Sequence, residues 1–104
     1  MKEIMKETFQ QEVIESDRPV VLDFWGPQCV PCLSLMPGVE TLAEKYGDKI
    51  KIAKVEAPKN RRLCIELRVL SLPTFLFYKE GKEVQRLLGK VNLKAIEEAI
   101  EKIV

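Results

Sequence analysis

The sequence of 104 residues contains no histidine, only three cysteines and no long uncharged apolar run. Without histidine there is no Cys–His catalytic pair, and three cysteines cannot complete the four-ligand set of a typical structural zinc site. The odd cysteine count also disfavours the disulfide framework of a secreted protein. No segment approaches the length of a signal-peptide core or a membrane span. We therefore expect a cytoplasmic protein that does not bind a membrane.

An excess of charge of either sign is missing as well. The 17 lysines and arginines nearly balance the 16 aspartates and glutamates, so the chain lacks the basic surface that binds nucleic acids or anionic membranes. The length fits one small domain, and 46% apolar residues can supply one core. Because no repeat, linker or low-complexity segment divides the chain, we predict a single domain over residues 1–104 and expect a monomer.

The sequence does contain a cysteine pair, Cys29-Val30-Pro31-Cys32, at the junction of two predicted elements. Residues 19–25 are β-branched and aromatic, which predicts a buried strand. Behind the pair, apolar residues recur at helical spacing: Leu33, Leu35, Met36, Val39, Leu42, Ala43 and Tyr46. A thiol at such a junction lies near unpaired backbone N–H groups and the positive end of the helix dipole, which favour a thiolate. We therefore expect the pair to be catalytic or metal-binding.

The rest of the chain predicts short strands and helices in alternation. The expected elements are an edge strand within residues 1–6, a helix opened by a capping box of Thr8 and Gln11, a strand over 50–55, a helix over 59–68, a hairpin of 74–78 with 83–88, and a last helix capped by Asn92. Pro37 predicts a kink in the helix after the cysteines, and Gly47 predicts its end. One apolar face of the helix over 59–68 is expected to carry Leu63, Cys64, Leu67 and Leu70. This order implies an α/β fold, with a central mixed sheet of about five strands flanked by about four helices.

Several of these residues together resemble the thioredoxin family. Asp23-Phe24-Trp25 precedes the Cys-x-Pro-Cys motif, Pro37 follows it, and Leu72-Pro73-Thr74 comes about forty residues later, ahead of Gly81 and Gly89. A Cys-x-x-Cys alone is weak evidence, but its placement between this strand and this helix is specific. The match spans nearly the whole chain. The resemblance implies the thioredoxin fold and a thiol–disulfide oxidoreductase that reduces protein disulfides, with no cofactor beyond its own two cysteines.

The two cysteines have different predicted roles. Residues three positions apart at a helix start lie close enough to form a disulfide. We assign Cys29, the outer sulfur, as the nucleophile, and Cys32, one turn further in, as the resolving thiol. Pro31 has no N–H and a fixed φ, so we expect it to help set the reduction potential of the pair.

Asp23 lies within the apolar strand, where a carboxylate needs a partner or a raised pKa. Since the chain has no histidine, a carboxyl is the remaining group that can move the proton of a thiol. The resemblance implies that Asp23 lies beneath Cys32 as its proton acceptor and that Lys54 lies near this acid. The alternative is that Asp23 only caps the chain or hydrogen-bonds locally.

The resemblance also implies a binding surface for the target chain. It implies a cis Pro73 that faces the disulfide, with the backbone of Leu72 pairing with the target; a simple strand start is the alternative for Pro73. Trp25 could equally be a core residue; the resemblance implies that it packs beside the site, and we expect a mixed role that includes contact with the target. The expected substrate-binding residues are Trp25, Val30, Pro31, Leu72, Pro73 and Thr74. Cys64 is interpreted as a small buried apolar residue, with a regulatory thiol as the alternative.

Three positions around the cysteines depart from the family. Gln28 replaces an aromatic residue, Val30 a glycine and Leu33 a basic residue, which makes the rim of the site more apolar and removes a cation near the thiol. We expect the usual partners, a thioredoxin-reductase-type electron donor and disulfide-containing target proteins, but a narrower set of them. Residues 29–37, 61–63 and 70–74 also resemble thioredoxins of anaerobic bacteria associated with glycine reductase. Two alternatives stay open, a disulfide isomerase or oxidase of the same fold and a redox-sensing adaptor without enzymatic activity.

Overall fold

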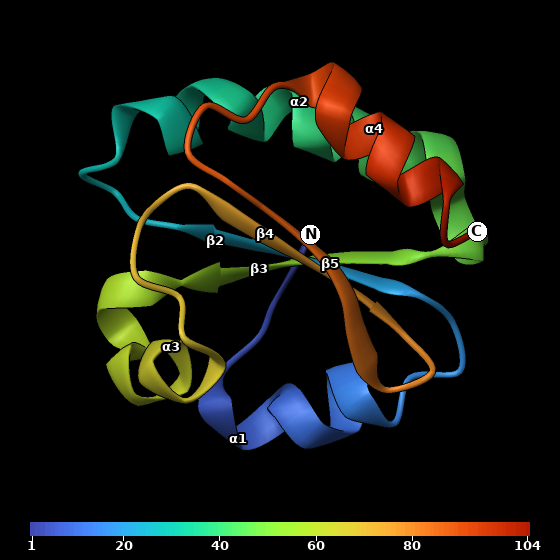
Figure 1. The fold of residues 1–104 in the computed structure, drawn as a ribbon, viewed down its shortest axis with the longest axis horizontal. Helices are drawn as coiled ribbons and strands as arrows, with labels where there is room; N and C mark the ends of the chain where they lie inside the picture. The colour runs from blue at the N-terminus through green and yellow to red at the C-terminus, as the bar shows by residue number, and fades with distance from the viewer.

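Figure 1 shows the computed structural model, which describes residues 1–104 as a central sheet with helices on both faces. The strands are β1 (Lys2–Glu3), β2 (Val20–Trp25), β3 (Lys51–Glu56), β4 (Thr74–Lys79) and β5 (Lys82–Leu88). The helices are α1 (Lys6–Phe9), which continues as a π-helical turn over Gln10–Ile14, α2 (Val30–Tyr46), α3 (Arg61–Leu67) and α4 (Leu93–Glu101). Short 3-10 turns follow α2 (Gly47–Lys49) and β3 (Ala57–Lys59). The predicted α/β fold, a mixed sheet of five strands flanked by four helices, is confirmed.

β2 lies at the centre of the sheet, whose strand order is β1-β3-β2-β4-β5. β1 and β2 run parallel to β3, while β4 runs antiparallel to β2, and β5 antiparallel to β4. A central strand covered on both faces needs apolar side chains on both, and all residues from 20 to 24 are buried, the acidic Asp23 included. Because β2 ends at Trp25 and α2 begins at Val30, the chain turns from sheet to helix at the cysteines, as predicted.

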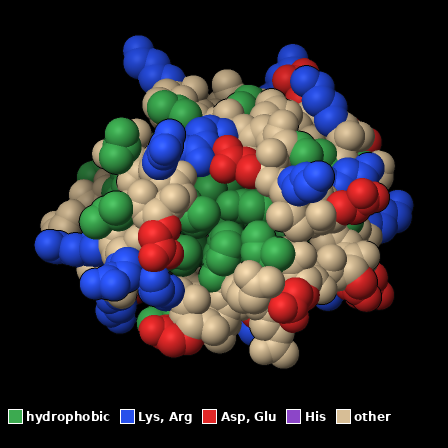
Figure 2. Space-filling view, turned by 60° about the horizontal axis from the view of Figure 1, so that its bottom comes forward, with side chains coloured by type: hydrophobic (Ala, Val, Ile, Leu, Met, Phe, Trp, Pro, Cys, Tyr) green, Lys and Arg blue, Asp and Glu red, His purple; other side chains and the backbone are tan.

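The sheet separates two apolar cores. Side chains alternate along a strand, so Val20, Leu22 and Phe24 pack toward α1 and α3, whereas Val21 packs toward α2 and α4. Figure 2 shows the face that α1 and α3 cover, where apolar side chains gather in a hollow at the centre and charged side chains surround them.

The first helix begins earlier than predicted, and the capping box of Thr8 and Gln11 is wrong. Ile4 is fully buried, and its N–H donates to the carbonyl of Lys54 (2.8 Å), so the extended chain continues through Ile4. Met5 is then the N-cap residue, and Thr8 lies inside the first turn, where its hydroxyl oxygen accepts a hydrogen bond from the N–H of Met5 (3.0 Å). Pairing with β3 therefore decides where the helix starts.

The ends of α2 and α4 are as predicted. Gly47 ends α2 with a φ of 52°, and the Asn92 side chain caps α4 by accepting a hydrogen bond from the N–H of Ala95 (2.8 Å). Pro37 lies inside α2 without ending it, since the helix continues to Tyr46. A kink at Pro37 stays a prediction.

The position expected for Leu70 is wrong, because α3 ends too early to include it. Arg68 adopts a left-handed conformation (φ 57°, ψ 42°) directly after the last helical residue. Leu63 and Cys64 are buried as predicted, but Leu70 lies beyond the helix and is 91% exposed. A non-glycine residue in this conformation gives no signal in the sequence.

The hairpin of β4 and β5 is confirmed, and it contains an irregularity. Glu80 and Gly81 form its turn with positive φ values of 53° and 78°, which suits the twist of the two strands. Tyr78 pairs with Glu83, but Leu76 pairs with Arg86. Two steps along β4 thus match three steps along β5, so β5 carries a β-bulge.

Candidate active site

The two cysteines lie at the first turn of α2. Cys29 is the N-cap residue, and its N–H donates to the carbonyl of Gly26 (3.0 Å). Pro31 lies in the first turn, where a missing N–H breaks no helical hydrogen bond. Cys29 and Cys32 form a disulfide with 5.3 Å between their Cα atoms, and the N–H of Cys32 donates to Sγ of Cys29 (3.2 Å). The spacing has the predicted consequence, since the pair closes within one helical turn.

The two cysteines differ in exposure. Cys32 is only 1% exposed, whereas Cys29 is partly exposed. Around them, Gln28, Val30 and Leu33 are all exposed, and Val30 is 71% exposed. A disulfide in another protein can therefore reach Cys29 from solvent, while Cys32 is accessible mainly to its own neighbour.

Asp23 is a buried carboxyl without a hydrogen bond. It is 1% exposed, and neither side-chain oxygen has a hydrogen-bond partner. Alternation along β2 places it on the same face as Val21, the face that α2 covers. Burial raises the pKa of Asp23 to about 7, and the positive charge of Lys54 opposes this rise. The alternative of a local cap or hydrogen bond has no contact to support it.

Lys54 pairs with Asp23 in the register of β2 and β3, so their side chains lie on the same face. The two side chains form no ion pair; the Lys54 ammonium instead lies 5.4 Å from the centroid of the Trp25 ring, within cation–π range. Trp25 is half-buried, and its Nε1–H has no hydrogen-bond partner. Lys54 thus acts on Asp23 by charge at a distance rather than by contact.

The segment that ends at Pro73 lies beside the cysteine loop. The Leu72–Pro73 peptide bond is cis, as the resemblance implied, and Pro73 is buried. A Cβ atom on Gly26 would lie 3.3 Å from Cδ1 of Leu72, so the absence of a side chain there lets the two segments approach. Thr74 pairs with Phe24 of β2, which attaches the segment to the strand that leads to the cysteines. Sequence reasoning missed the role of Gly26, because only the folded chain shows which residue approaches it.

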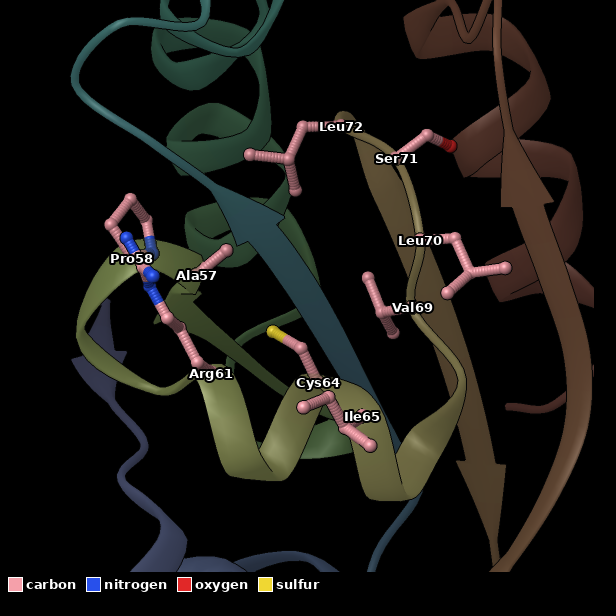
Figure 3. A pocket seen from close by; sticks show the side chains of 9 residues that line it. All are labelled: Ala57, Pro58, Arg61, Cys64, Ile65, Val69, Leu70, Ser71 and Leu72. Atoms are coloured by element: carbon pink, nitrogen blue, oxygen red, sulfur yellow. The ribbon is translucent and has the colours of Figure 1, made fainter.

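A pocket of about 410 Å³ opens next to Leu72, between α3 and the segment after it (Figure 3). Nine residues line it: Ala57, Pro58, Arg61, Cys64, Ile65, Val69, Leu70, Ser71 and Leu72. Figure 3 shows the Cys64 sulfur directed from α3 toward the space between Ala57 and Val69. Cys64 is 8% exposed, and burial raises the pKa of its thiol, which supports the interpretation as a small apolar residue. The sequence prediction placed Leu70 on the apolar face of the helix over 59–68 and therefore missed that Leu70 lines this pocket.

No three or more Cys, Asp or Glu side chains gather closely enough to hold a metal ion. None of the helices combines the length and the apolar composition that crossing a membrane requires.

A partly exposed sulfur in a disulfide with a buried one, at the start of a helix, defines the class of thiol–disulfide oxidoreductases. Comparison with known proteins narrows this class. The thioredoxin family model matches residues 1–102. Thioredoxin 1 of Nostoc sp. is 36% identical over 100 residues, which cover 96% of this chain and 94% of the relative.

Two thioredoxins of other bacteria are similarly related. That of Acetoanaerobium sticklandii is 37% identical over 102 residues, covering 98% of this chain and 97% of its own. That of Peptoclostridium acidaminophilum is 44% identical over 85 residues, covering 82% of this chain and 77% of its own. The chain belongs to the thioredoxin family, and its Cys29–Cys32 pair carries out dithiol–disulfide exchange. An isomerase, an oxidase or a non-enzymatic adaptor is not favoured.

Proposed function

We propose that the protein reduces disulfides of target proteins, with Cys29 as nucleophile and Cys32 as resolving thiol. The observation that carries this proposal is the difference in exposure: Cys29 is partly exposed at the N-terminus of α2, while Cys32 is 1% exposed. The helix N-terminus stabilises a thiolate on the residue that a target can reach.

The reaction transfers two electrons from the dithiol to the target. The Cys29 thiolate attacks one sulfur of the target disulfide, whose S–S bond breaks as the mixed disulfide forms, and the first target thiolate leaves and takes up a proton. Cys32 then loses its proton and attacks Sγ of Cys29, which lies within reach because the Cα atoms are 5.3 Å apart. The second target thiolate leaves, and the Cys29–Cys32 disulfide forms.

We assign Asp23 as the acceptor of the Cys32 proton. A pKa of about 7 leaves this carboxyl both charged and protonated forms near neutral pH, as proton exchange requires. Lys54 supports this role because its charge lowers the pKa of Asp23 against the effect of burial. Both groups lie on the face of the sheet that α2 covers.

The target chain is proposed to bind across the rim of the site and the segment before β4. Val30 and Pro31 are exposed, and Trp25 and Leu72 are partly exposed, so all four can contribute apolar contact. Pro73 would face the disulfide. Thr74 would act by shaping this segment, since its hydroxyl donates to the carbonyl of Ser71 (2.6 Å).

The proposed partners are a thioredoxin-reductase-type electron donor and disulfide-containing proteins in the cytoplasm, and residues 1–104 are proposed to act as a single monomeric domain. The exposed Gln28, Val30 and Leu33 support a narrower partner set, because they lie where a partner would contact the rim. The association with glycine reductase stays a prediction. If a standard thioredoxin reductase reduced this protein as fast as its own thioredoxin, the narrower partner set would be wrong.

A trapping experiment tests the assignment of the two cysteines. Cys32→Ser should hold Cys29 in mixed disulfides with its targets, which mass spectrometry can identify. Cys29→Ser should lose at least about 10³-fold in insulin-disulfide reduction, because the nucleophile is gone. Mixed disulfides on Cys32 in Cys29→Ser, or unchanged insulin reduction, would reverse the assignment. A reduction potential of about −270 mV, typical of thioredoxins, would support a reductant, and one of about −120 mV would support an oxidant.

A further inference from the structure

The C-terminal end of α3 is held by a side chain from another strand. The last turn closes through hydrogen bonds from the N–H of Arg68 to the carbonyl of Ile65 (3.1 Å) and from the N–H of Val69 to that of Cys64 (2.8 Å). Two other carbonyls at this end of the helix, those of its last residue Leu67 and its C-cap Arg68, both accept hydrogen bonds from the Arg86 guanidinium at 2.9 Å. A cation at this position also faces the negative end of the helix dipole.

Arg86 reaches this helix because of the β-bulge in β5. Arg86 pairs with Leu76 and Glu83 with Tyr78, and both β4 residues face the core under α1 and α3. In a regular strand, side chains three positions apart point to opposite faces. The extra residue in β5 brings Glu83 and Arg86 to one face, on the side of the sheet where α3 lies.

Glu83 fixes the orientation of the guanidinium. Nε of Arg86 donates to Oε2 of Glu83 (2.7 Å) and Nη2 donates to Oε1 (2.8 Å), while Nη1 and Nη2 donate to the two carbonyls. The side chains of Arg86 and Glu83 are only 25% and 33% exposed. Only a planar guanidinium with several N–H donors can donate to a carboxylate and two carbonyls at the same time, and a lysine ammonium lacks that geometry.

The segment that leaves this anchor is the one that leads to Pro73. Residues 69–72 follow directly after the two carbonyls that Arg86 binds, and they form one wall of the pocket in Figure 3. The other end is fixed where Thr74 pairs with Phe24 and with Leu88. Both ends of the segment are therefore attached, one of them through Arg86.

We infer that Arg86, oriented by Glu83 across the β-bulge, is a positioning residue that holds residues 69–72 ready to pair with the target chain. This inference rests on the proposed function and on the pairing of the Leu72 backbone with the target that the family resemblance implies. A segment that is already ordered loses less conformational freedom when the target binds. The hydrogen bonds of Arg86 thus affect the affinity for the target and do not affect the thiol chemistry at Cys29.

The test compares Arg86→Met, Arg86→Lys and Glu83→Gln with a matched control, Arg62→Met, an exposed arginine of α3 for which no hydrogen bond or ion pair is found. For insulin reduction, Arg86→Met should raise KM about five- to tenfold with little change in kcat, since the lost contacts act in binding. Arg86→Lys should restore only part of the loss, and Glu83→Gln should show a smaller rise. The rate with a small aromatic disulfide, which has no chain to pair with Leu72, should stay within about twofold of the parent.

Hydrogen exchange and melting temperature separate positioning from simple stability. Amide exchange at Val69 and Leu72 should accelerate in Arg86→Met at temperatures well below melting, whether or not the protein reduces insulin. Unchanged exchange there, or an unchanged KM with only a lower melting temperature, would overturn the inference. An equal loss with the small disulfide would also overturn it, because Arg86 would then act on the thiol. Failure of the parent to reduce insulin would instead count against the proposed function.

Discussion

Asp23 and Glu83 are the same kind of group on opposite faces of the sheet, with opposite environments. Asp23 faces α2, is 1% exposed and has no hydrogen bond. Glu83 lies on the side of α3, is partly exposed and accepts two hydrogen bonds from Arg86. A buried carboxyl without a partner destabilises the fold but stays free to exchange a proton. A carboxylate that accepts two hydrogen bonds from one guanidinium contributes to structure instead.

The largest effect that this comparison predicts is that of Asp23→Asn. The pKa of Asp23 is about 7 in the folded protein against an ordinary value of 3.8. Its charged form therefore opposes folding, and the variant should be more stable by up to about 4 kcal/mol above pH 7. The same change should slow the attack of Cys32 about 10²-fold, because the proton acceptor is lost. Denaturant unfolding of the oxidised protein and single-turnover kinetics measure the two effects.

The sign of the pH dependence provides the control. A raised pKa means that the favourable contribution of Asp23 is complete below about pH 4 and is lost as the pH rises through about 7. The gain in stability from Asp23→Asn should therefore grow as the pH rises from about 4 to about 7, and it should be absent below about pH 4. Asp17→Asn, at an exposed position, should change neither stability nor rate. A gain that does not depend on pH would show that the pKa of Asp23 is the same in the folded and the unfolded protein.

Glu83→Gln should have the opposite and smaller effect on stability. It removes a charged pair that is partly exposed to solvent, which should cost about 1 kcal/mol. The potential of the cysteine pair and the rate with a small disulfide should be those of the parent. Denaturant unfolding beside the exposed control Glu98→Gln checks this result. A change in the reduction potential of the cysteine pair would contradict the separate roles that we assign to Asp23 and Glu83.

Lys54→Met should change the pKa of Asp23 and have no effect on Glu83. The charge of Lys54 lowers the pKa of Asp23, so its removal should move that pKa further upward. Titration of the Asp23 carboxyl carbon by NMR measures the shift directly, with the exposed Lys49→Met as control. An unchanged pKa would mean that Lys54 acts mainly through its contact with Trp25.

Cys64→Ala should have the smallest effect. A buried thiol that serves only as an apolar side chain contributes at most about 1 kcal/mol to stability. Insulin reduction should stay within about twofold of the parent before and after peroxide treatment. Loss of activity on oxidation in the parent, but not in Cys64→Ala, would instead make Cys64 a regulatory thiol.

The sequence predicted the features that depend on periodicity and on short motifs. The apolar strand before Cys29, the helix after Cys32 and the cap at Asn92 follow from residues that are neighbours in the chain. The burial of Asp23 followed from the apolar residues on both sides of it. For these features, local pattern and final structure agree.

The sequence did not predict features that depend on distant contacts. Thr8 has the residues of a capping box, but the pairing of Ile4 with β3 moves the helix start. Leu70 fits a helical stripe that Arg68 interrupts. The contact of Arg86 with Leu67 depends on a one-residue bulge in β5, which the alternation of residues 83–88 does not reveal.

The same bulge has a consequence at the border of the sheet. β5 is an outer strand, and an outer strand presents unpaired N–H and C=O groups on which a strand of another molecule can assemble. The bulge interrupts the regular spacing of those groups, and Lys82 and Glu83 add charge beside it. At the other border, β1 is only two residues long. Both borders are therefore poor templates for aggregation, and the pairing with a target chain that we propose takes place at residues 69–72 instead.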